Sequence, residues 1–204
     1  MTVEMASKKL PDWTACWRKD PIMSSTLLMK VYTWTRIQSF YNLFSKANPI
    51  GKTCLEIGAG TGYISKLLAQ KYRLDTTLID NNREAYEMFQ KVSKEGRYIL
   101  IDAFSFNPDE KFDIAFSDGL IEHFYHKERM EMILLHKNLV KADGYVMIFV
   151  PKNSWFVTHL CDWKGGLEFK YNYSQLEKEL TRASLEPVAR TEDWHMIGVL
   201  SKIM

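Results

Sequence analysis

Apolar residues beyond position 50 follow two alternating patterns. Short runs of apolar and β-branched residues predict strands over residues 53–57, 76–79, 98–101, 112–116 and 145–150. Between these runs, residues 64–72 and 126–139 have apolar side chains at helical spacing, and residues 83–94 are charged and helix-favouring. Strands and helices in regular alternation predict βαβ units with right-handed crossovers, and therefore an α/β fold around a parallel sheet.

The last part of the chain follows a different pattern. Ser174 predicts a helix N-cap before residues 175–183, with Glu177 as its capping-box partner. Two further β-like runs, at residues 186–190 and 195–203, are separated by too few residues for a helical crossover, so they must pair antiparallel. The pattern therefore predicts a mostly parallel sheet that ends in an antiparallel hairpin.

The residues before the first strand form a region of their own. Residues 22–46 have apolar side chains on one helical face, and a Pro-Ile-Gly sequence at 49–51 separates this segment from the first strand. We therefore divide the chain into an N-terminal helical lobe, residues 1–49, and an α/β domain, residues 50–204.

Composition narrows the class of protein. The chain has 204 residues, of which 46% are hydrophobic and 25% charged, and these values exclude a disordered or fibrous chain. No run approaches the roughly 20 apolar residues of a membrane helix, and the N-terminus has no signal-like apolar stretch, so we expect a cytoplasmic protein without a membrane span. The three cysteines, Cys16, Cys54 and Cys161, have no zinc-like spacing, and we expect free thiols and no metal.

Charge is the one uneven property. The net charge of +2 is too small to favour nucleic-acid binding, but residues 1–50 hold seven Lys and Arg against three Asp and Glu. Within this segment Arg18, Lys19, Lys30 and Arg36 either attract an anionic ligand or form a solvated helix face.

A glycine-rich turn gives the strongest chemical signal. Gly58, Gly60 and Gly62 follow the first strand directly and precede a helix, where glycines allow a close approach to a ligand and helix amides can receive an anionic group. A dinucleotide site has its third glycine one residue later, so the spacing disfavours NAD. Asp80, at the end of the second strand, is placed to accept both hydroxyls of a ribose.

The order of five motifs resembles that of the class I S-adenosylmethionine-dependent methyltransferases, with the small-molecule, ubiquinone/menaquinone-biosynthesis-like branch as the nearest type. The resemblance covers about residues 50–204. The motifs are LEIGAGTG at 55–62, LID at 78–80, DAF at 102–104, FDIAFSDGLIEHF at 112–124 and GYVMIFVPKNS at 144–154. It implies a Rossmann-like, seven-stranded sheet with helices on both faces, and S-adenosylmethionine as cofactor.

The resemblance also implies residue roles. Glu56 would support the methionine ammonium of the cofactor, Asp80 the ribose hydroxyls and Asp102 the adenine amino group. The remaining cofactor-binding residues that it implies are Gly58, Ala59, Gly60, Gly62, Asn81, Ala103 and Asp118.

Methyl transfer from a sulfonium is an in-line displacement that depends mainly on positioning and on exclusion of water. A base is needed only for a protonated nucleophile. His123 is the candidate base because its ordinary pKa lies near neutrality, although it could instead cap a helix. Asp118 is the second catalytic candidate, since it could face the methyl donor or the acceptor. The segment lacks the Pro-Pro pair of enzymes that methylate DNA bases or glutamine.

Residues 151–173 form a long, aromatic-rich connection at the same edge of the predicted sheet, where we expect part of the substrate wall. Trp13, Trp17, Tyr32 and Trp34 of the N-terminal lobe could close over it as a lid. Aromatic walls favour a small, aromatic or apolar acceptor.

Three other functions stay open at this stage. The chain could methylate protein or RNA, it could be a non-catalytic S-adenosylmethionine-binding scaffold, or, least favoured, it could be an NAD-dependent dehydrogenase. The sequence gives neither the acceptor nor the oligomeric state.

Overall fold

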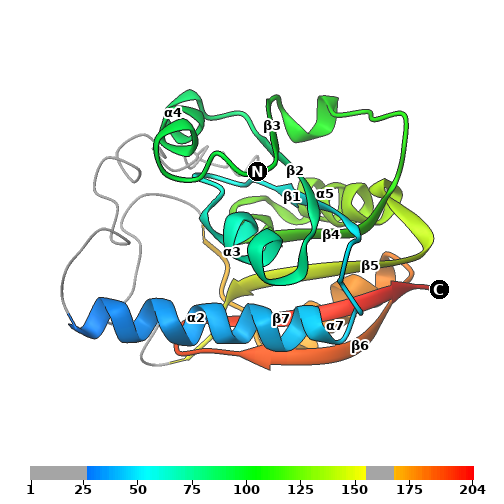
Figure 1. Ribbon diagram of the computed structural model, residues 1–204. Helices are drawn as coiled ribbons and strands as arrows, with labels where there is room; N and C mark the ends of the chain where they lie inside the picture. The colour runs from blue at the N-terminus through cyan, green and yellow to red at the C-terminus, as the bar shows by residue number, and fades with distance from the viewer. Residues whose placement is uncertain (1–26, 155–167) are drawn as a thin grey trace, which may run out of the picture.

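The computed structural model describes residues 27–154 and 168–204 (Figure 1). Trp13, Trp17, Cys16, His159 and Cys161 lie outside these residues, and so does most of the predicted substrate wall. Within the described ranges no helix is long and apolar enough to cross a membrane.

Seven strands form one sheet in the order β3-β2-β1-β4-β5-β7-β6. Among the described strands, β7 alone runs opposite to the other six, and it lies between β5 and β6. The predicted Rossmann-like sheet with an antiparallel C-terminal hairpin is therefore confirmed. The strands are β1 Thr53–Ile57, β2 Asp75–Asp80, β3 Arg97–Leu100, β4 Phe112–Asp118, β5 Val140–Pro151, β6 Leu185–Glu192 and β7 Met196–Ile203.

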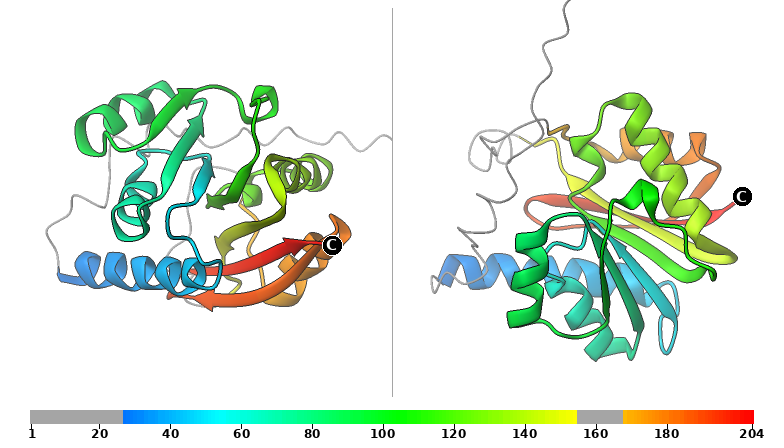
Figure 2. Two further views of the ribbon diagram at one scale, coloured as in Figure 1. Left: turned by 45° about the vertical axis from the view of Figure 1, so that its right-hand side comes forward. Right: turned by 90° about the horizontal axis from the view of Figure 1, so that it is seen from above.

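Helices cover both faces of the sheet, as the view from above shows (Figure 2). Two helices, α5 and α7, pack on one face, and α2, α3 and α4 pack on the other. Alternate strand residues point to opposite faces, so Leu55 contacts the first layer and Cys54 the second. The helices are α2 Leu27–Ser45, α3 Tyr63–Tyr72, α4 Arg83–Val92, α5 His126–Leu139 and α7 Tyr173–Arg182, with short 3-10 turns η2 Ala103–Ser105 and η3 Ile121–His123.

The α2 helix shares the core of the sheet. Phe40 stacks on Phe149 of β5 with a centroid separation of 4.0 Å, and Phe44 meets Phe116 of β4 edge to face at 5.2 Å. All four rings are buried, and burying one such ring stabilises a fold by roughly 1.5–3 kcal/mol. The division of the chain after residue 49 stays a prediction, but α2 itself is packed as part of the central layer.

The cap of α7 differs from the prediction. Asn172, and not Ser174, is the N-cap, because its side-chain oxygen accepts from the Gln175 N–H at 2.9 Å. The Gln175 side chain in turn accepts from the Asn172 N–H at 2.9 Å, which completes a capping box without Glu177. The Tyr173 hydroxyl donates to the Thr191 carbonyl on β6, which holds the first turn against the sheet.

The long connection after β5 has its two ends joined. Tyr171 donates from its N–H to the Pro151 carbonyl at 2.8 Å and accepts from the Asn153 N–H at 2.7 Å. The connection therefore leaves and returns at one point, beside the carboxyl end of β5.

Candidate active site

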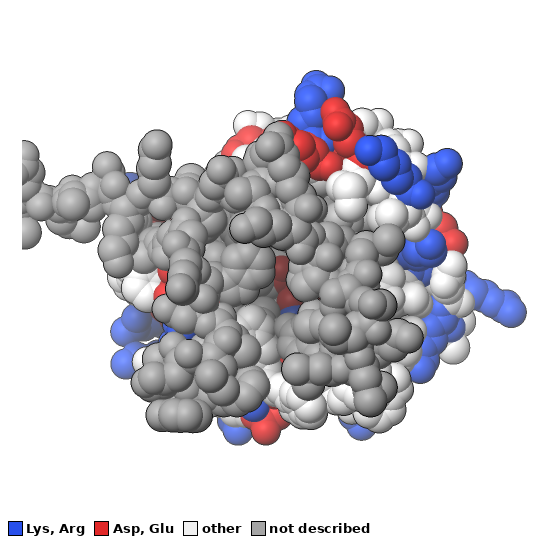
Figure 3. Space-filling view, turned by 90° about the vertical axis from the view of Figure 1, so that its left-hand side faces the viewer, with Lys and Arg blue, Asp and Glu red and all other residues white. Residues whose placement is uncertain are grey.

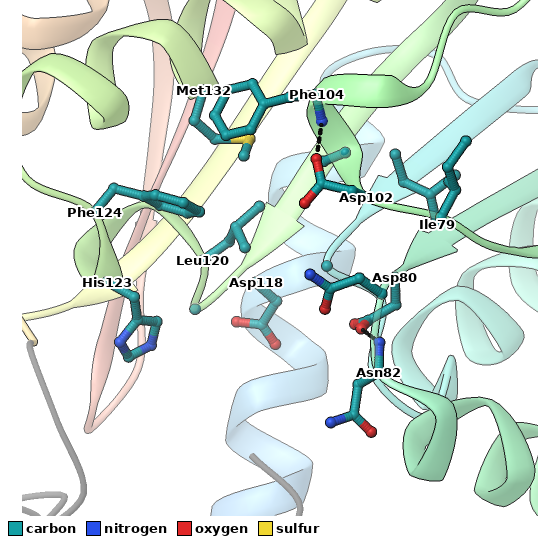
Figure 4. Close-up of a pocket in the computed structure, with 15 residues that line it drawn as sticks. Ile79, Asp80, Asn82, Asp102, Phe104, Asp118, Leu120, His123, Phe124 and Met132 are labelled. Carbon is teal, nitrogen blue, oxygen red and sulfur yellow. Dashed lines mark hydrogen bonds between the residues drawn. The ribbon is translucent and has the colours of Figure 1, made fainter. Parts of the chain in front are cut away.

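A pocket of about 280 Å³ opens at the carboxyl ends of β1, β2, β3 and β4. This is the edge where open α/β sheets bind ligands. Asp80 and Asp102 lie on one side of it, Phe124 and His123 on the other, and Asp118 between them (Figure 4). Its lining residues are Gly58, Ile79, Asp80, Asn81, Asn82, Ile101, Asp102, Ala103, Phe104, Asp118, Gly119, Leu120, His123, Phe124 and Met132.

The glycine turn has a backbone that only glycine adopts without strain. Gly58, Gly60 and Gly62 have φ values of 69°, 53° and 67°. A Cβ on Gly62 would lie 2.7 Å from Leu78 Cδ2, and one on Gly58 would lie 2.9 Å from Leu120 Cδ1. The turn therefore lets α3 begin close against the sheet and leaves Gly58 at the pocket wall.

Asp80 ties this turn to the second strand. Its Oδ2 accepts from the Gly60 N–H and its Oδ1 accepts from the Asn82 N–H, both at 2.8 Å. Burial raises the pKa of Asp80, and these backbone bonds oppose that rise. Each carboxylate oxygen has a second lone pair, so the side chain can still accept hydrogen bonds from the hydroxyl groups of a ligand.

Asp102, which follows β3, lines the same side of the pocket as Asp80. Its Oδ1 accepts from the Phe104 N–H at 2.9 Å and thereby caps η2. Phe104 and Phe124 lie edge to face at 6.1 Å, and Met132 lies beside them (Figure 4). An acceptor oxygen next to aromatic and thioether side chains is suited to a flat, amino-bearing heterocycle.

Glu56 lies behind the glycine turn and does not line the pocket. It is 3% exposed, and its Oε2 has no hydrogen-bond partner among the described residues. Burial raises the pKa of Glu56 to about 8. A buried acceptor without a partner is costly, and a cationic ligand group would compensate for it.

The other end of the pocket holds the two catalytic candidates. Asp118 ends β4 and forms an ion pair with Arg36 of α2. His123 ends η3, is mostly buried, and has its Nε2 3.8 Å from Glu122 Oε1. Burial raises the pKa of Glu122 to about 8.

Arg36 fits neither role that its sequence context suggested, attraction of an anionic ligand or part of a solvated helix face. It is 7% exposed and bonds two carboxylates, Asp118 and Asp193, so it is neither on a solvated face nor free for an anionic ligand. Trp34, by contrast, is 62% exposed.

The structure brings seven of the predicted site residues to one pocket: Gly58, Asp80, Asn81, Asp102, Ala103, Asp118 and His123. The other four, Glu56, Ala59, Gly60 and Gly62, support the turn from behind or form its far side. Ala59, for example, packs on Leu78 and Phe89.

Sequence reasoning missed Asn82 and the apolar part of the pocket. Asn82 and Phe104 follow predicted strand ends, and that position could have identified them. Met132 is periodic with core residues of α5, so its pattern gives no sign that it also lines the pocket. The other unpredicted lining residues are Ile79, Ile101, Gly119, Leu120 and Phe124.

Figure 3 looks onto this edge of the molecule. Lys and Arg side chains predominate along the right flank of this view, with a few Asp and Glu side chains among them.

Two of three comparisons with known proteins found matches. The family described as "Methyltransferase domain" matches residues 30–195. Among curated proteins nothing matches.

Solved structures of methyltransferases have the same fold. A 1,6-didemethyltoxoflavin-N1-methyltransferase from Burkholderia thailandensis superposes with a TM-score of 0.69 at 16% identity, covering 100% of this chain and 94% of that one. A magnesium protoporphyrin IX methyltransferase from Synechocystis PCC 6803, with bound S-adenosylhomocysteine, gives 0.71 at 15% identity, with 96% of each chain covered. A Clostridium acetobutylicum S-adenosylmethionine-dependent methyltransferase gives 0.69 at 14% identity, covering 92% of this chain and 99% of that one.

Proposed function

This chain belongs to the methyltransferase domain family and uses S-adenosylmethionine, and from that premise we propose that it methylates a small, aromatic or apolar metabolite bound beside Asp118 and His123. One observation supports the proposal most: the glycine turn, Asp80 and Asp102 converge on the same pocket that Asp118 and His123 close at its other end. The two toxoflavin- and porphyrin-directed neighbours act on small molecules, by their descriptions.

The residues present suit the cofactor. The positive φ values of Gly58, Gly60 and Gly62 let the backbone of this turn approach a ligand closely. Asp80 would accept the ribose hydroxyls, and Asp102 the adenine amino group, with Ala103 and Asn81 beside the ring. Glu56, whose buried Oε2 lacks a hydrogen-bond partner among the described residues, would receive the ammonium of the methionine part.

When bound, the sulfonium cofactor supplies an activated methyl group that is transferred to a nucleophile by in-line displacement. The protein's part is to aim the acceptor and to exclude water. Asp118 lies at the centre of the pocket, where it orients the acceptor or the donor. His123 would take the proton that a hydroxyl or amine acceptor loses as its bond to the methyl forms.

Calorimetry with S-adenosylhomocysteine tests the cofactor site. We expect Asp80→Asn and Asp102→Asn each to weaken binding about tenfold, because each loses one charge-assisted hydrogen bond. Binding by neither the wild type nor any variant would refute the cofactor assignment.

Labelled S-adenosylmethionine with a panel of phenols, carboxylic acids and amines tests the acceptor. We expect His123→Gln to keep S-adenosylhomocysteine affinity and to lose transfer by about 10²–10⁴-fold. Label that enters only protein or RNA from a cell extract, and none of the small acceptors, would contradict the proposed acceptor class.

A further inference from the structure

One buried arginine connects the N-terminal helix to the centre of the pocket. Arg36 of α2 donates from Nη2 to Asp118 Oδ1 and from Nη1 to Asp193 Oδ2, the latter at 2.8 Å. Asp118 is a pocket residue, whereas Asp193 lies in the β6–β7 hairpin and does not line the pocket. The planar guanidinium fork can hold two carboxylates in fixed directions, which a lysine ammonium does less well.

The position of Arg36 is itself tightly determined. Its guanidinium carbon lies 4.8 Å from the Phe40 ring centroid and 5.2 Å from that of Phe149. The Phe149 ring lies against Gly198 of β7, where any Cβ would be 2.4 Å from Phe149 Cε1. The guanidinium therefore rests on two stacked rings whose own place is fixed by packing.

Asp193 is held from several directions as well. Its Oδ1 accepts from the N–H groups of His195 and Met196, both at 2.8 Å. Its Oδ2 also accepts from Ser39 Oγ at 3.3 Å. Burial raises the pKa of Asp193, but the Arg36 guanidinium and the hydrogen bonds outweigh it, so this pKa lies below its ordinary value and the carboxylate stays charged. Asp193 thus provides a rigid anchor for one arm of the fork.

The other arm acts on a less restrained group. The Asp118 side chain is 23% exposed, more than the 9% of Arg36 or the 1% of Asp193. Arg36 is the group that holds its Oδ1. Without this restraint the carboxylate would be free to turn among its rotamers at the pocket wall.

We propose that Arg36 is a positioning residue of the methyltransferase site, which holds the Asp118 carboxylate in the direction required for cofactor binding. This inference rests on the proposed function. The simpler alternative is that Arg36 only fastens α2 to the sheet through Asp193.

A double-mutant cycle on S-adenosylhomocysteine affinity separates the two roles. We expect Arg36→Lys to weaken binding about fivefold in the wild-type background and less than about twofold in the Asp118→Asn background. A purely structural role would give the same loss in both backgrounds. Calorimetry gives the affinities, and circular dichroism checks that each variant is folded.

One charge-removing variant serves as a matched control. Glu179→Gln removes one partner of another mostly buried ion pair, Arg129–Glu179, whose atoms lie 3.1 Å apart. We expect it to lower the unfolding temperature and to change S-adenosylhomocysteine affinity less than about twofold.

Each other outcome overturns the inference. Unchanged or tighter binding by Arg36→Lys, an additive cycle, or an equal loss in Glu179→Gln would show that Arg36 does not act through Asp118. If Arg36→Lys fails to fold, Asp118→Asn must still lower affinity in the folded protein for the inference to stand. Absence of binding by the wild type would instead refute the proposed function.

Discussion

At the scale of single residues, the site contains buried carboxyl groups that the fold alone does not need. Glu56 and Glu122 are each nearly inaccessible, and each has an Oε2 without a hydrogen-bond partner among the described residues. Burial raises the pKa of each to about 8, so each prefers its neutral form near pH 7. Groups of this kind lower stability where they are charged, and they persist where a ligand or a reaction uses them.

Glu56→Gln tests this for the cofactor site. The pKa of Glu56 is raised on folding, so the folded state binds the extra proton, and its contribution to stability is lost as pH rises towards 8. We therefore expect Glu56→Gln to raise the unfolding temperature at pH 8.5 by about 3 °C or more, with little change at pH 5. We also expect it to weaken S-adenosylhomocysteine binding about tenfold.

The wild type should release a proton when the ammonium of S-adenosylhomocysteine binds. Calorimetry in two buffers of different ionisation enthalpy measures that release, which Glu56→Gln should abolish. Equal proton release by the variant would assign it to another group.

Sequence alone predicted the polar half of the site and not the rest. Asp80 and Asp102 follow strand ends, where topology dictates proximity, so one chain is enough to place them together. The ion pair between Arg36 and Asp118 joins residues 82 positions apart, and no local pattern specifies which arginine of a helix will meet which strand end. Met132 follows the core periodicity of α5, and Phe124 lies just before that helix; only the packed structure shows that both border a cavity.

At the scale of elements, the hydrophobic pattern predicts where strands and helices lie, and in α7 a side-chain cap determines where the helix begins. The predicted helix at 126–139 has the observed bounds of α5, because its apolar spacing is unbroken. The predicted start of α7 was wrong because two candidate caps, Asn172 and Ser174, lie two residues apart. Asn172 is the N-cap because it forms a reciprocal capping box with Gln175, and because the Tyr173 hydroxyl bonds to β6.

This correction gives a prediction with its own control. Asn172→Ala should destabilise the protein by about 1 kcal/mol, because the Gln175 N–H loses its acceptor. Ser174→Ala, in the first turn of the same helix, should change stability by less than about 0.5 kcal/mol. Urea denaturation measures both. A larger effect at Ser174 would mean that the helix begins where the sequence pattern first placed it.

At the scale of the whole molecule, buried titratable groups set how stability depends on pH. His136 and His195 have pKa values lowered to about 4 by burial, so their charging in the unfolded state reduces stability as pH falls below about 6.5. Glu56 and Glu122 act in the opposite direction, because their raised pKa values reduce stability as pH rises from about 4.5 to 8. The two effects oppose each other between about pH 4.5 and 6.5.

We therefore expect the free energy of unfolding to decline between pH 6.5 and 8.5, by on the order of 2 kcal/mol. Glu122→Gln should reduce that decline, and it should make stability rise more steeply between pH 5.5 and 6.5, because the opposing effect of Glu122 is then absent. Urea unfolding at pH 5.5, 6.5 and 8.5 measures it. A decline of the same size in the variant would show that Glu122 does not contribute.

The position of β7 in the sheet has a consequence for folding during synthesis. This strand follows β6 in the chain, yet it is inserted between β5 and β6 and pairs with both. While the ribosome has made β6 but not β7, the edge of β5 is open and β6 has no neighbour to join. An open, apolar strand edge is the surface at which nascent chains associate. The β5-β7-β6 part of the sheet therefore forms in one late step, when β7 pairs with both neighbours. A chain that stalls or is cleaved just before β7 would expose the β5 edge and aggregate, whereas a chain that includes β7 could complete the sheet.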